Sequence, residues 1–128
     1  METIIKHKAG KTWIETVPGT GMLANENDAL DLVGQCGEND TPLLLIQSEN
    51  LPDAFYDLHT GLAGSALLKF SNYRIIVAAV VNPKLANAGK FWEFALETNR
   101  GSEFHVCPDY ETAMQWLLRD ELIQFSGG

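Results

Sequence analysis

Two short runs of apolar residues that lack polar alternation constrain the fold of this chain most strongly. The first is Leu43 to Ile46, and the second is Ile75 to Val81, which is rich in β-branched residues. A strand with one solvated face alternates apolar and polar side chains, whereas a strand covered on both faces does not. We therefore predict that the two runs form adjacent central strands of a mostly parallel sheet.

The first residues of the chain predict an antiparallel hairpin at one side of that sheet. Thr3 to Lys8 and Thr12 to Val17 are short β-prone runs, and they flank Ala9-Gly10. Glycine tolerates the positive φ that a tight hairpin turn requires. The segment from Pro18 to Gly21 cannot hold regular structure, so the hairpin should end before it.

Apolar residues at helical spacing predict a first helix from Glu26 to Gln35. Asn25 or Asn27 is expected to cap its first turn, and Gly37 is expected to end it. The same kind of pattern predicts three further helices and one more short strand. The helices fall in the second half of residues 55–70, around residues 91–96 and from Pro108-Asp109 onward, and the strand runs from Glu103 to Cys107.

The predicted order of elements is β-β-α-β-α-β-α-β-α, and repeated βα units imply parallel strands joined by right-handed crossovers. The expected fold class is α/β, with a single mixed, mostly parallel five-stranded sheet and about four helices. A chain of 128 residues is close to the usual size of one domain. We expect this domain to span residues 1–122 and residues 123–128 to form a frayed tail.

The charge balance disfavours nucleic acid as a partner. The chain has 17 acidic and 9 basic residues, which gives a formal net charge of -8. Nucleic-acid binding needs a cationic face that releases counterions, and the only local basic cluster consists of Lys6, His7, Lys8 and Lys11. We interpret these residues as the protected edge of a strand.

Cysteine usage and the N-terminal sequence both favour a cytoplasmic location. Cys36 and Cys107 are far apart and show no CxxC spacing, so neither a disulfide framework nor a zinc site is indicated. The first residues lack the cationic start and apolar core of a signal peptide. No apolar run approaches the ~18 residues of a membrane span, and we expect no membrane partner.

The sequence shows no motif for a metal or a cofactor. His7, His59 and His105 lack the i, i+4 spacing of helical metal pairs, although His59 could meet Glu49 or Asp57 in the fold. The glycine-containing turns match neither a Walker loop nor a dinucleotide fingerprint. We expect neither a metal nor a cofactor.

Several segments carry a resemblance that spans nearly the whole chain. These segments are Asp28 to Gly34, Glu49 to Leu51, Phe55 to Gly64, Leu68 to Arg74 and Glu97 to Gly101. In them the chain resembles a small bacterial family catalogued as a domain of unknown function, number 4180, and this resemblance implies no established activity.

The string Asp57-Leu58-His59-Thr60-Gly61-Leu62 also resembles the phosphorylation motif of STAS domains, which include bacterial anti-sigma-factor antagonists. In the antagonists a strand is followed by Asp-Ser-Ser-Gly-Leu-Gly, and the second serine is phosphorylated at the start of a helix. The resemblance places Thr60 at the phosphorylated position. This chain departs from the motif, because it has one extra residue after the aspartate, His59 replaces the first serine, and the loop from Ser48 to Tyr56 is longer.

Thr60 is therefore either an N-cap of the second helix or a phosphorylation site at the start of that helix. Its neighbours carry more polar side chains than a structural connection needs, which predicts a binding surface beside it. The members of this predicted surface are Glu49, Asn50, Asp57, His59 and Gly61.

Two function classes remain open from the sequence. The leading hypothesis is a non-catalytic regulatory or protein-binding module that is switched at Thr60. The alternative is a small-ligand-binding domain or an enzyme that uses a pocket where the Ser48 to Thr60 loop meets the carboxyl ends of the strands. Glu49, Asp57, His59 and Thr60 would line that pocket.

Three aromatic residues suggest a further contact surface. Phe91, Trp92 and Phe94 cannot all face one side of a helix, since consecutive residues such as Phe91 and Trp92 point about 100° apart. We expect some of this apolar surface to form a homodimer interface, although Trp92 could also do no more than cover a sheet edge.

Overall fold

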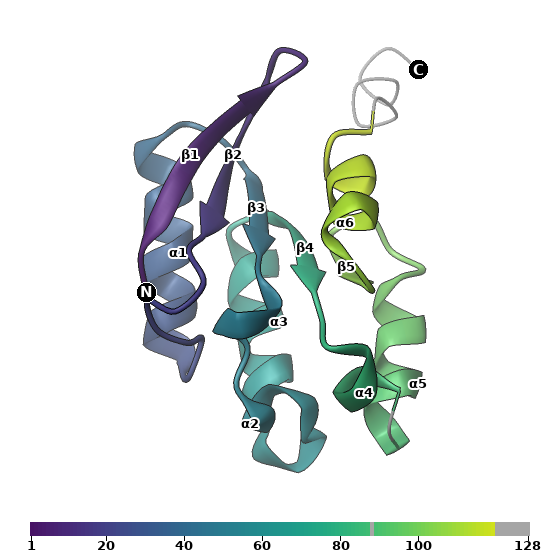
Figure 1. Cartoon of the computed structure of the whole chain (residues 1–128). Helices are drawn as coiled ribbons and strands as arrows, with labels where there is room; N and C mark the ends of the chain where they lie inside the picture. The colour runs from purple at the N-terminus through teal and green to yellow at the C-terminus, as the bar shows by residue number, and fades with distance from the viewer. Residues whose placement is uncertain (88, 120–128) are drawn as a thin grey trace.

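The computed structural model describes residues 1–87 and 89–119, which form a five-stranded sheet with helices on both faces (Figure 1). The strands lie side by side in the order in which they occur in the chain. The first two pair antiparallel, and all other neighbours are parallel. The strands are β1 (Thr3–Lys8), β2 (Lys11–Thr16), β3 (Leu43–Ile46), β4 (Ile76–Val80) and β5 (Phe104–Cys107).

This arrangement confirms the predicted α/β class and the adjacent central strands. Leu43 pairs with Ile76 and Ile46 with Ala79, so the two apolar runs lie directly beside each other. All four residues of β3 are buried, as are the last four of β4. The absence of polar alternation in both runs therefore reflects burial on both faces of the sheet.

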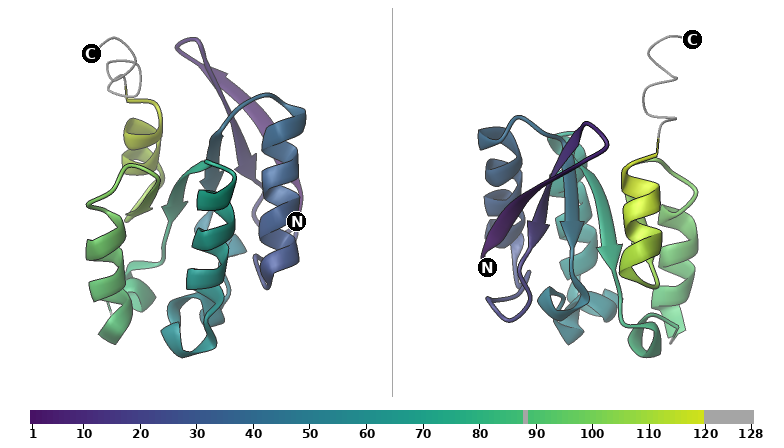
Figure 2. Two further views of the ribbon diagram at one scale, coloured as in Figure 1. Left: turned by 180° about the vertical axis from the view of Figure 1, so that it is seen from behind. Right: turned by 45° about the horizontal axis from the view of Figure 1, so that its top comes forward.

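The three helices that connect parallel strands all lie on one face of the sheet (Figure 2). They are α1 (Glu26–Glu38), α3 (Leu62–Asn72) and α5 (Gly89–Thr98). Because the strand order follows the chain order, crossovers of one hand must place every connecting helix on the same side. Among the described helices, only α6 (Tyr110–Leu117), which follows the last strand, covers the opposite face.

The described residues contain six helices where about four were predicted. The two additional ones are single turns inside connections, α2 (Asp53–Tyr56) and α4 (Pro83–Ala86). Two 3₁₀ turns, η1 (Ser48–Asn50) and η2 (Leu58–Thr60), lie in the same long connection as α2. A single turn is too short to show helical periodicity, so the sequence pattern could not reveal these segments.

The first helix begins where it was predicted and ends three residues later. The Asn25 side chain accepts a hydrogen bond from the Asp28 N–H at 3.0 Å, which decides between the two predicted caps. The prediction that Gly37 ends the helix is wrong, because the helix continues to Glu38. Asn39 ends it instead, and its backbone and side-chain nitrogens both donate to the Gln35 carbonyl.

The hairpin also matches its prediction. The turn consists of Ala9 and Gly10, which have φ values of 54° and 78°. Both values lie in the left-handed region, as a two-residue turn between twisted strands requires. The tail predicted for residues 123–128 lies outside the described residues, and so does the predicted domain boundary at residue 122.

Candidate functional site

The loops that follow β2, β3 and β4 enclose a shallow hollow at the carboxyl ends of the strands, the lower edge in Figure 1. This carboxyl-edge pocket has a volume of about 470 Å³. The loop from Ser48 to Thr60 does meet the strand ends here, and Glu49 lines the pocket. The complete lining is Gly19, Met22, Ser48, Glu49, Leu51, Asp53, Tyr56, Asn82 and Leu85. Asp57, His59 and Thr60, which were also expected to line a pocket here, lie outside it.

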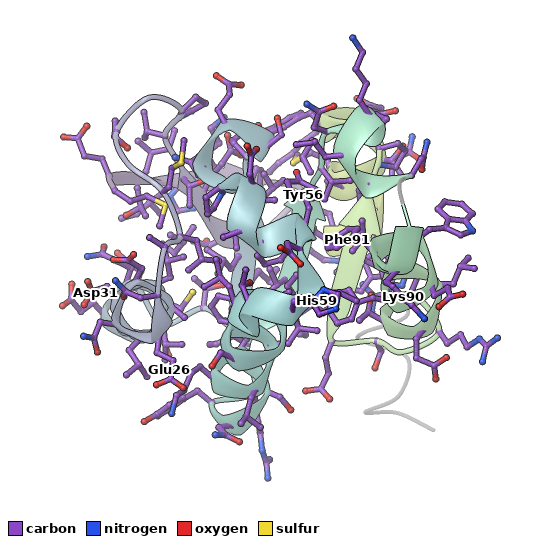
Figure 3. The ribbon with its side chains drawn as sticks, turned by 90° about the horizontal axis from the view of Figure 1, so that it is seen from below. Glu26, Asp31, Tyr56, His59, Lys90 and Phe91 are labelled. Carbon is purple, nitrogen blue, oxygen red and sulfur yellow. The ribbon has the colours of Figure 1, made fainter. Side chains whose placement is uncertain are left out.

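Tyr56 places a hydroxyl donor at the wall of this pocket. Its oxygen accepts a hydrogen bond from the Asn82 N–H at 3.0 Å, which leaves the hydroxyl proton free to donate. Burial raises the pKa of Tyr56, the hydrogen bond from Asn82 lowers it by less, and nearby Asp53 adds a further small increase. The Tyr56 ring packs against Phe91 with centroids 5.0 Å apart, and Figure 3 shows both side chains from the carboxyl edge. The phenol is therefore a fixed, protonated donor.

Thr60 sits in a projecting segment formed by α2 and η2, residues 53–60, which we call the edge lobe. The Thr60 Oγ1 lies 2.6 Å from the Ala54 carbonyl oxygen and 2.8 Å from that of Asp57, so its proton is donated to these carbonyls. The same oxygen accepts from the Leu62 N–H at 3.2 Å. One hydroxyl thus connects α2, η2 and the first residue of α3.

Thr60 is not itself the N-cap residue of α3. Gly61 occupies that position with φ 77°, a left-handed conformation that glycine adopts at little cost. Thr60 still satisfies an N–H of the first turn through its side chain, one residue earlier than a standard cap. The sequence pattern located the helix start to within two residues, but it did not foresee the left-handed glycine between them.

Asp57 and His59 form an exposed pair beside Thr60. The Asp57 Oδ1 lies 3.2 Å from His59 Nδ1 and accepts the His59 backbone N–H at 3.1 Å. The side chains are 59% and 94% exposed, so solvent screens the pair and it adds little stability. The Thr60 hydroxyl bonds to backbone carbonyls rather than to His59. These three residues therefore do not have the geometry of a nucleophile with its base.

Asn50 is the one member of the predicted binding surface that is fully buried, so its prediction as a surface residue is wrong. Its Oδ1 accepts from the Thr16 hydroxyl at 2.8 Å. Its Nδ2 donates to the carbonyls of Val17 and Gly21 at 3.0 and 2.9 Å. The side chain joins the loop after β2 to the loop after β3, a structural role that explains a polar residue in this connection.

The aromatic residues of α5 divide between core and surface. Phe91 is 1% exposed and packs against Phe55, Tyr56 and Phe94, so the expectation that it lies in an interface is wrong. Phe94 is partly buried against the same core. Trp92 is 49% exposed, and it lines a mainly apolar groove of about 350 Å³ that we call the Trp92 groove. The other lining residues are Val81, Pro83, Ala86, Asn87, Ala95, Leu96, Asn99, Val106 and Pro108.

A buried carboxylate that sequence reasoning missed lies on the α6 face of the sheet. Glu15 is 3% exposed, and its Oε1 accepts from Trp13 Nε1 at 3.1 Å and from the Tyr110 hydroxyl at 2.8 Å. Its Oε2 accepts from Lys6 Nζ at 3.0 Å and from Gln47 Nε2 at 3.1 Å. Burial pushes the pKa of Glu15 upward, but the hydrogen bonds from Trp13, Lys6 and Tyr110 outweigh it, and the pKa is lowered.

The two cysteines are unsuited to nucleophilic chemistry. Both are buried free thiols. Burial raises the pKa of Cys36 to about 12, and burial with a contribution from Asp109 raises that of Cys107 to about 11. Because the thiolate is the reactive form, both side chains stay inert near neutral pH.

Residues 1–87 and 89–119 contain neither a metal-binding cluster nor a membrane-spanning helix. No group of three or more His, Cys, Asp or Glu side chains in this part of the chain is placed to hold a metal ion. No helix there is long and apolar enough to cross a membrane.

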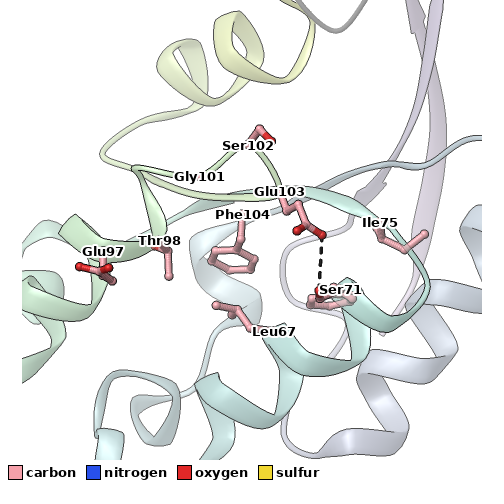
Figure 4. A pocket seen from close by; sticks show the side chains of 10 residues that line it. Leu67, Ser71, Ile75, Glu97, Thr98, Gly101, Ser102, Glu103 and Phe104 are labelled. Carbon is pink, nitrogen blue, oxygen red and sulfur yellow. Dashed lines mark hydrogen bonds between the residues drawn. The ribbon is translucent and has the colours of Figure 1, made fainter. Parts of the chain in front are cut away.

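A further hollow of about 260 Å³ lies at the opposite edge of the sheet, between α3 and α5 (Figure 4). Its walls include Leu67, Phe70 and Phe104, and the Ser71 hydroxyl donates to Glu103 across its mouth at 3.4 Å. None of the residues predicted as functional lines it. The carboxyl edge, where Glu49, Tyr56 and the edge lobe meet, is therefore the better candidate for a functional site.

Comparison with known proteins identifies the family but adds no activity. No curated protein and no solved structure matches the chain. A family model described as "Domain of unknown function (DUF4180)" matches residues 8–117, which run from the end of β1 through α6. Because this match covers nearly all of the fold, the chain belongs to the DUF4180 family.

Proposed function

We propose that the chain is a non-catalytic protein-binding module of the cytoplasm whose carboxyl edge is regulated through Thr60. The observation that carries this proposal is the bonding of the Thr60 hydroxyl. A single exposed side chain bonds to Ala54 and Asp57 of the edge lobe and to Leu62 of α3. A chemical change at this oxygen alters three segments at once.

Phosphorylation is the change that fits this position best. A phosphate on Oγ1 replaces the hydroxyl proton, so the carbonyls of Ala54 and Asp57 lose their donor. The added negative charge also lies beside the Asp57 carboxylate, which repels it. The edge lobe must rearrange, and it carries Asp53 and Tyr56 of the carboxyl-edge pocket. Phosphorylation of Thr60 would then change the shape of the surface that a partner protein contacts.

The likeness to STAS domains supports the same proposal. The string from Asp57 to Leu62 places Thr60 where the antagonists carry their phosphorylated serine, and η2 followed by α3 supplies the required helix start. The buried, unpaired cysteines suit the reducing cytoplasm. Trp92 and Leu96, 49% and 48% exposed, offer the partner an apolar contact beside the same edge.

A small-ligand-binding domain is the second candidate, and the protonated Tyr56 hydroxyl in the carboxyl-edge pocket is the observation that favours it. Glu49 and Asp53 line the pocket, and its lining contains no lysine or arginine. This combination suits a small ligand that carries a positive charge and a hydrogen-bond acceptor. Titration with a panel of primary and quaternary amines would test it, with the Tyr56→Phe variant as the control.

The main proposal is tested with three variants of one residue. Thr60→Ser keeps the hydroxyl, Thr60→Ala removes it without adding charge, and Thr60→Asp adds the charge but cannot donate to Ala54. Each variant and the wild type would be used to capture proteins from cells that naturally contain the chain. We expect a protein that wild type and Thr60→Ser retain and Thr60→Asp loses, followed by a direct affinity measurement with that protein.

Mapping of phosphorylated peptides from the same cells provides the second measurement. A phosphate on Thr60 in at least one growth condition is the expected result. If no captured protein distinguishes Thr60→Asp from wild type, and if Thr60 is never modified, regulation at this residue is excluded.

A further inference from the structure

The two lateral edges of the sheet differ in a way that bears on how the molecule associates. An edge strand offers unpaired backbone N–H and C=O groups to any strand of suitable shape. At the β5 edge the outward backbone groups of Val106 are already occupied. The Asn99 side chain accepts from the Val106 N–H at 2.7 Å and donates to the Val106 carbonyl at 3.0 Å. Asn99 therefore blocks strand addition at β5.

The β1 edge is open. The Glu2 carbonyl accepts from the Val17 N–H at 2.9 Å and the Glu2 N–H donates to Thr20, so the backbone groups of Glu2 face the second strand. Orientation alternates along an antiparallel strand, and the backbone groups of Thr3, Ile5 and His7 consequently point away from β2. These groups form a row on the outer side of β1, which Figure 1 shows at the margin of the sheet.

Strand β1 exposes two large apolar side chains at this edge. Ile4 is 43% exposed and Ile5 is 49% exposed, and they lie on opposite faces of the strand. Lysines commonly protect such an edge from association. Here the Lys6 amine turns back to Glu15 at 3.0 Å and to the Tyr110 hydroxyl at 3.4 Å. Lys8 is then the one lysine of β1 left to protect the edge.

We propose that β1 pairs with β1 of a second copy of this chain, antiparallel about a two-fold axis at Ile5. Ile5 then lies opposite Ile5 of the second copy, and Thr3 lies opposite its His7, so the outward backbone groups of all three residues pair. Glu2 lies opposite Lys8 of the second copy, twice in the dimer. Neither Glu2 nor Lys8 has an ion-pair partner within residues 1–87 and 89–119, so this register pairs two free charges.

The closed β5 edge explains why the occupant is a second copy and why assembly stops at two. Pairing of β1 with β5 of a neighbour would be head-to-tail and would build rings or open fibres. Asn99 prevents that arrangement because it holds both backbone groups of Val106. Pairing of β1 with β1 uses the open β1 edge of each copy, and Asn99 hinders extension of the sheet at β5.

Cysteine substitutions test the register in the full-length chain. In an antiparallel hydrogen-bonded pair the Cα atoms are about 5.5 Å apart, which a disulfide spans. Ile5→Cys should therefore form a disulfide-linked dimer with diamide as oxidant. Ile4→Cys should not, because the two copies of residue 4 are separated by roughly 8 Å in this register. The native cysteines, 0% and 1% exposed, supply a low background.

Light scattering at high micromolar concentration measures the association itself. Wild type should show twice the 14.1 kDa chain mass. Ile5→Pro should lose the dimer and keep the fold, because the N–H that proline removes points away from β2. Leu68→Lys, at a residue 57% exposed on α3, is the control and should remain dimeric.

Charge reversal gives the final comparison. Glu2→Lys or Lys8→Glu alone should weaken the dimer, and the double reversal should restore it. A monomeric wild type, a dimer that survives Ile5→Pro, or a disulfide in Ile4→Cys but not in Ile5→Cys would each overturn the proposal.

Discussion

Glu15 shows how a single buried charge becomes favourable in this molecule. A carboxylate removed from water is costly unless donors replace its hydration. Four donors reach Glu15 from strands β1 and β2, from Gln47 after β3, and from α6. The contact with Tyr110 joins residues that are 95 positions apart in the chain. Glu15 therefore fixes the hairpin and α6 relative to each other.

We predict that Glu15→Gln lowers the free energy of unfolding by about 2–3 kcal/mol, since hydrogen bonds to a charged group are lost and one amide nitrogen must face former donors. Chemical denaturation would measure the change. Glu97→Gln is the matched control, because Glu97 and its partner Arg100 are 74% and 77% exposed. Its effect should stay within about 0.5 kcal/mol. Equal effects of the two variants would contradict the assigned role of Glu15.

The same carboxylate predicts a pH dependence with a definite sign. The folded pKa of Glu15 lies below its ordinary value of 4.5, so its stabilisation is fully present above that value. The stabilisation is lost as the pH falls from there through the lowered folded pKa. The wild type should therefore lose more stability than Glu15→Gln over this acidic range. Parallel stability curves for the two proteins would refute the prediction.

At the scale of single elements, the hairpin turn contains a correctable strain. Ala9 has φ 54°, a left-handed conformation that costs an L-residue roughly 1–2 kcal/mol. Asparagine tolerates this conformation, and Asn-Gly is a preferred sequence for a turn with two positive φ values. Ala9→Asn should therefore stabilise the protein by about 0.5–1 kcal/mol, seen as a raised Tm. A lowered Tm would contradict this account of the turn.

The β5 edge supplies the second prediction at this scale. Asn99→Ala removes both bonds to Val106 and should cost about 1–2 kcal/mol. It also exposes strand-pairing groups, so assemblies larger than a dimer should form as concentration rises. Asn99→Asp keeps the bond from the Val106 N–H and loses the one to its carbonyl. Its stability should therefore lie between those of the wild type and Asn99→Ala. Stability and mass unchanged by Asn99→Ala would refute the blocking role.

The elements that the sequence predicted correctly are those with a local signal. The apolar runs of β3 and β4 and the Ala9-Gly10 turn depend on neighbouring residues, and each lies where it was expected. The single turns α2 and α4 have no such signal. Gly37 was predicted to end α1, yet it lies within the helix because Asn39 supplies the terminal bonds.

The candidate site was predictable only in its location. Glu49 and the loop after β3 were expected at the carboxyl ends of the strands, because that edge follows from a parallel sheet. Tyr56 was missed because its role depends on the Asn82 N–H, 26 residues later in the chain. Asn50 was assigned to the surface because its bonds to Thr16 and Gly21 form only in three dimensions.

At the scale of the whole molecule, the strand order separates two surfaces. β1 and β5 are the two terminal strands of the sheet, and α5 lies beside β5. Strand pairing at β1 and contacts at the Trp92 groove therefore occur on opposite sides of the molecule (Figure 1). A dimer through β1 leaves both Trp92 grooves open to a partner protein. A dimer through α5, which the aromatic residues of that helix suggested in the sequence, would cover them.

Trp92→Glu distinguishes these two dimers. Trp92 is 49% exposed, so the substitution should change the free energy of unfolding by only about 0.5 kcal/mol. If the subunits join through β1, the mass measured by light scattering remains that of a dimer, and only capture of a partner protein is lost. If they join through α5, the buried and unpaired glutamate dissociates the dimer. We expect the first result. A monomeric Trp92→Glu variant beside a dimeric wild type would show that the interface lies at α5 and not at β1.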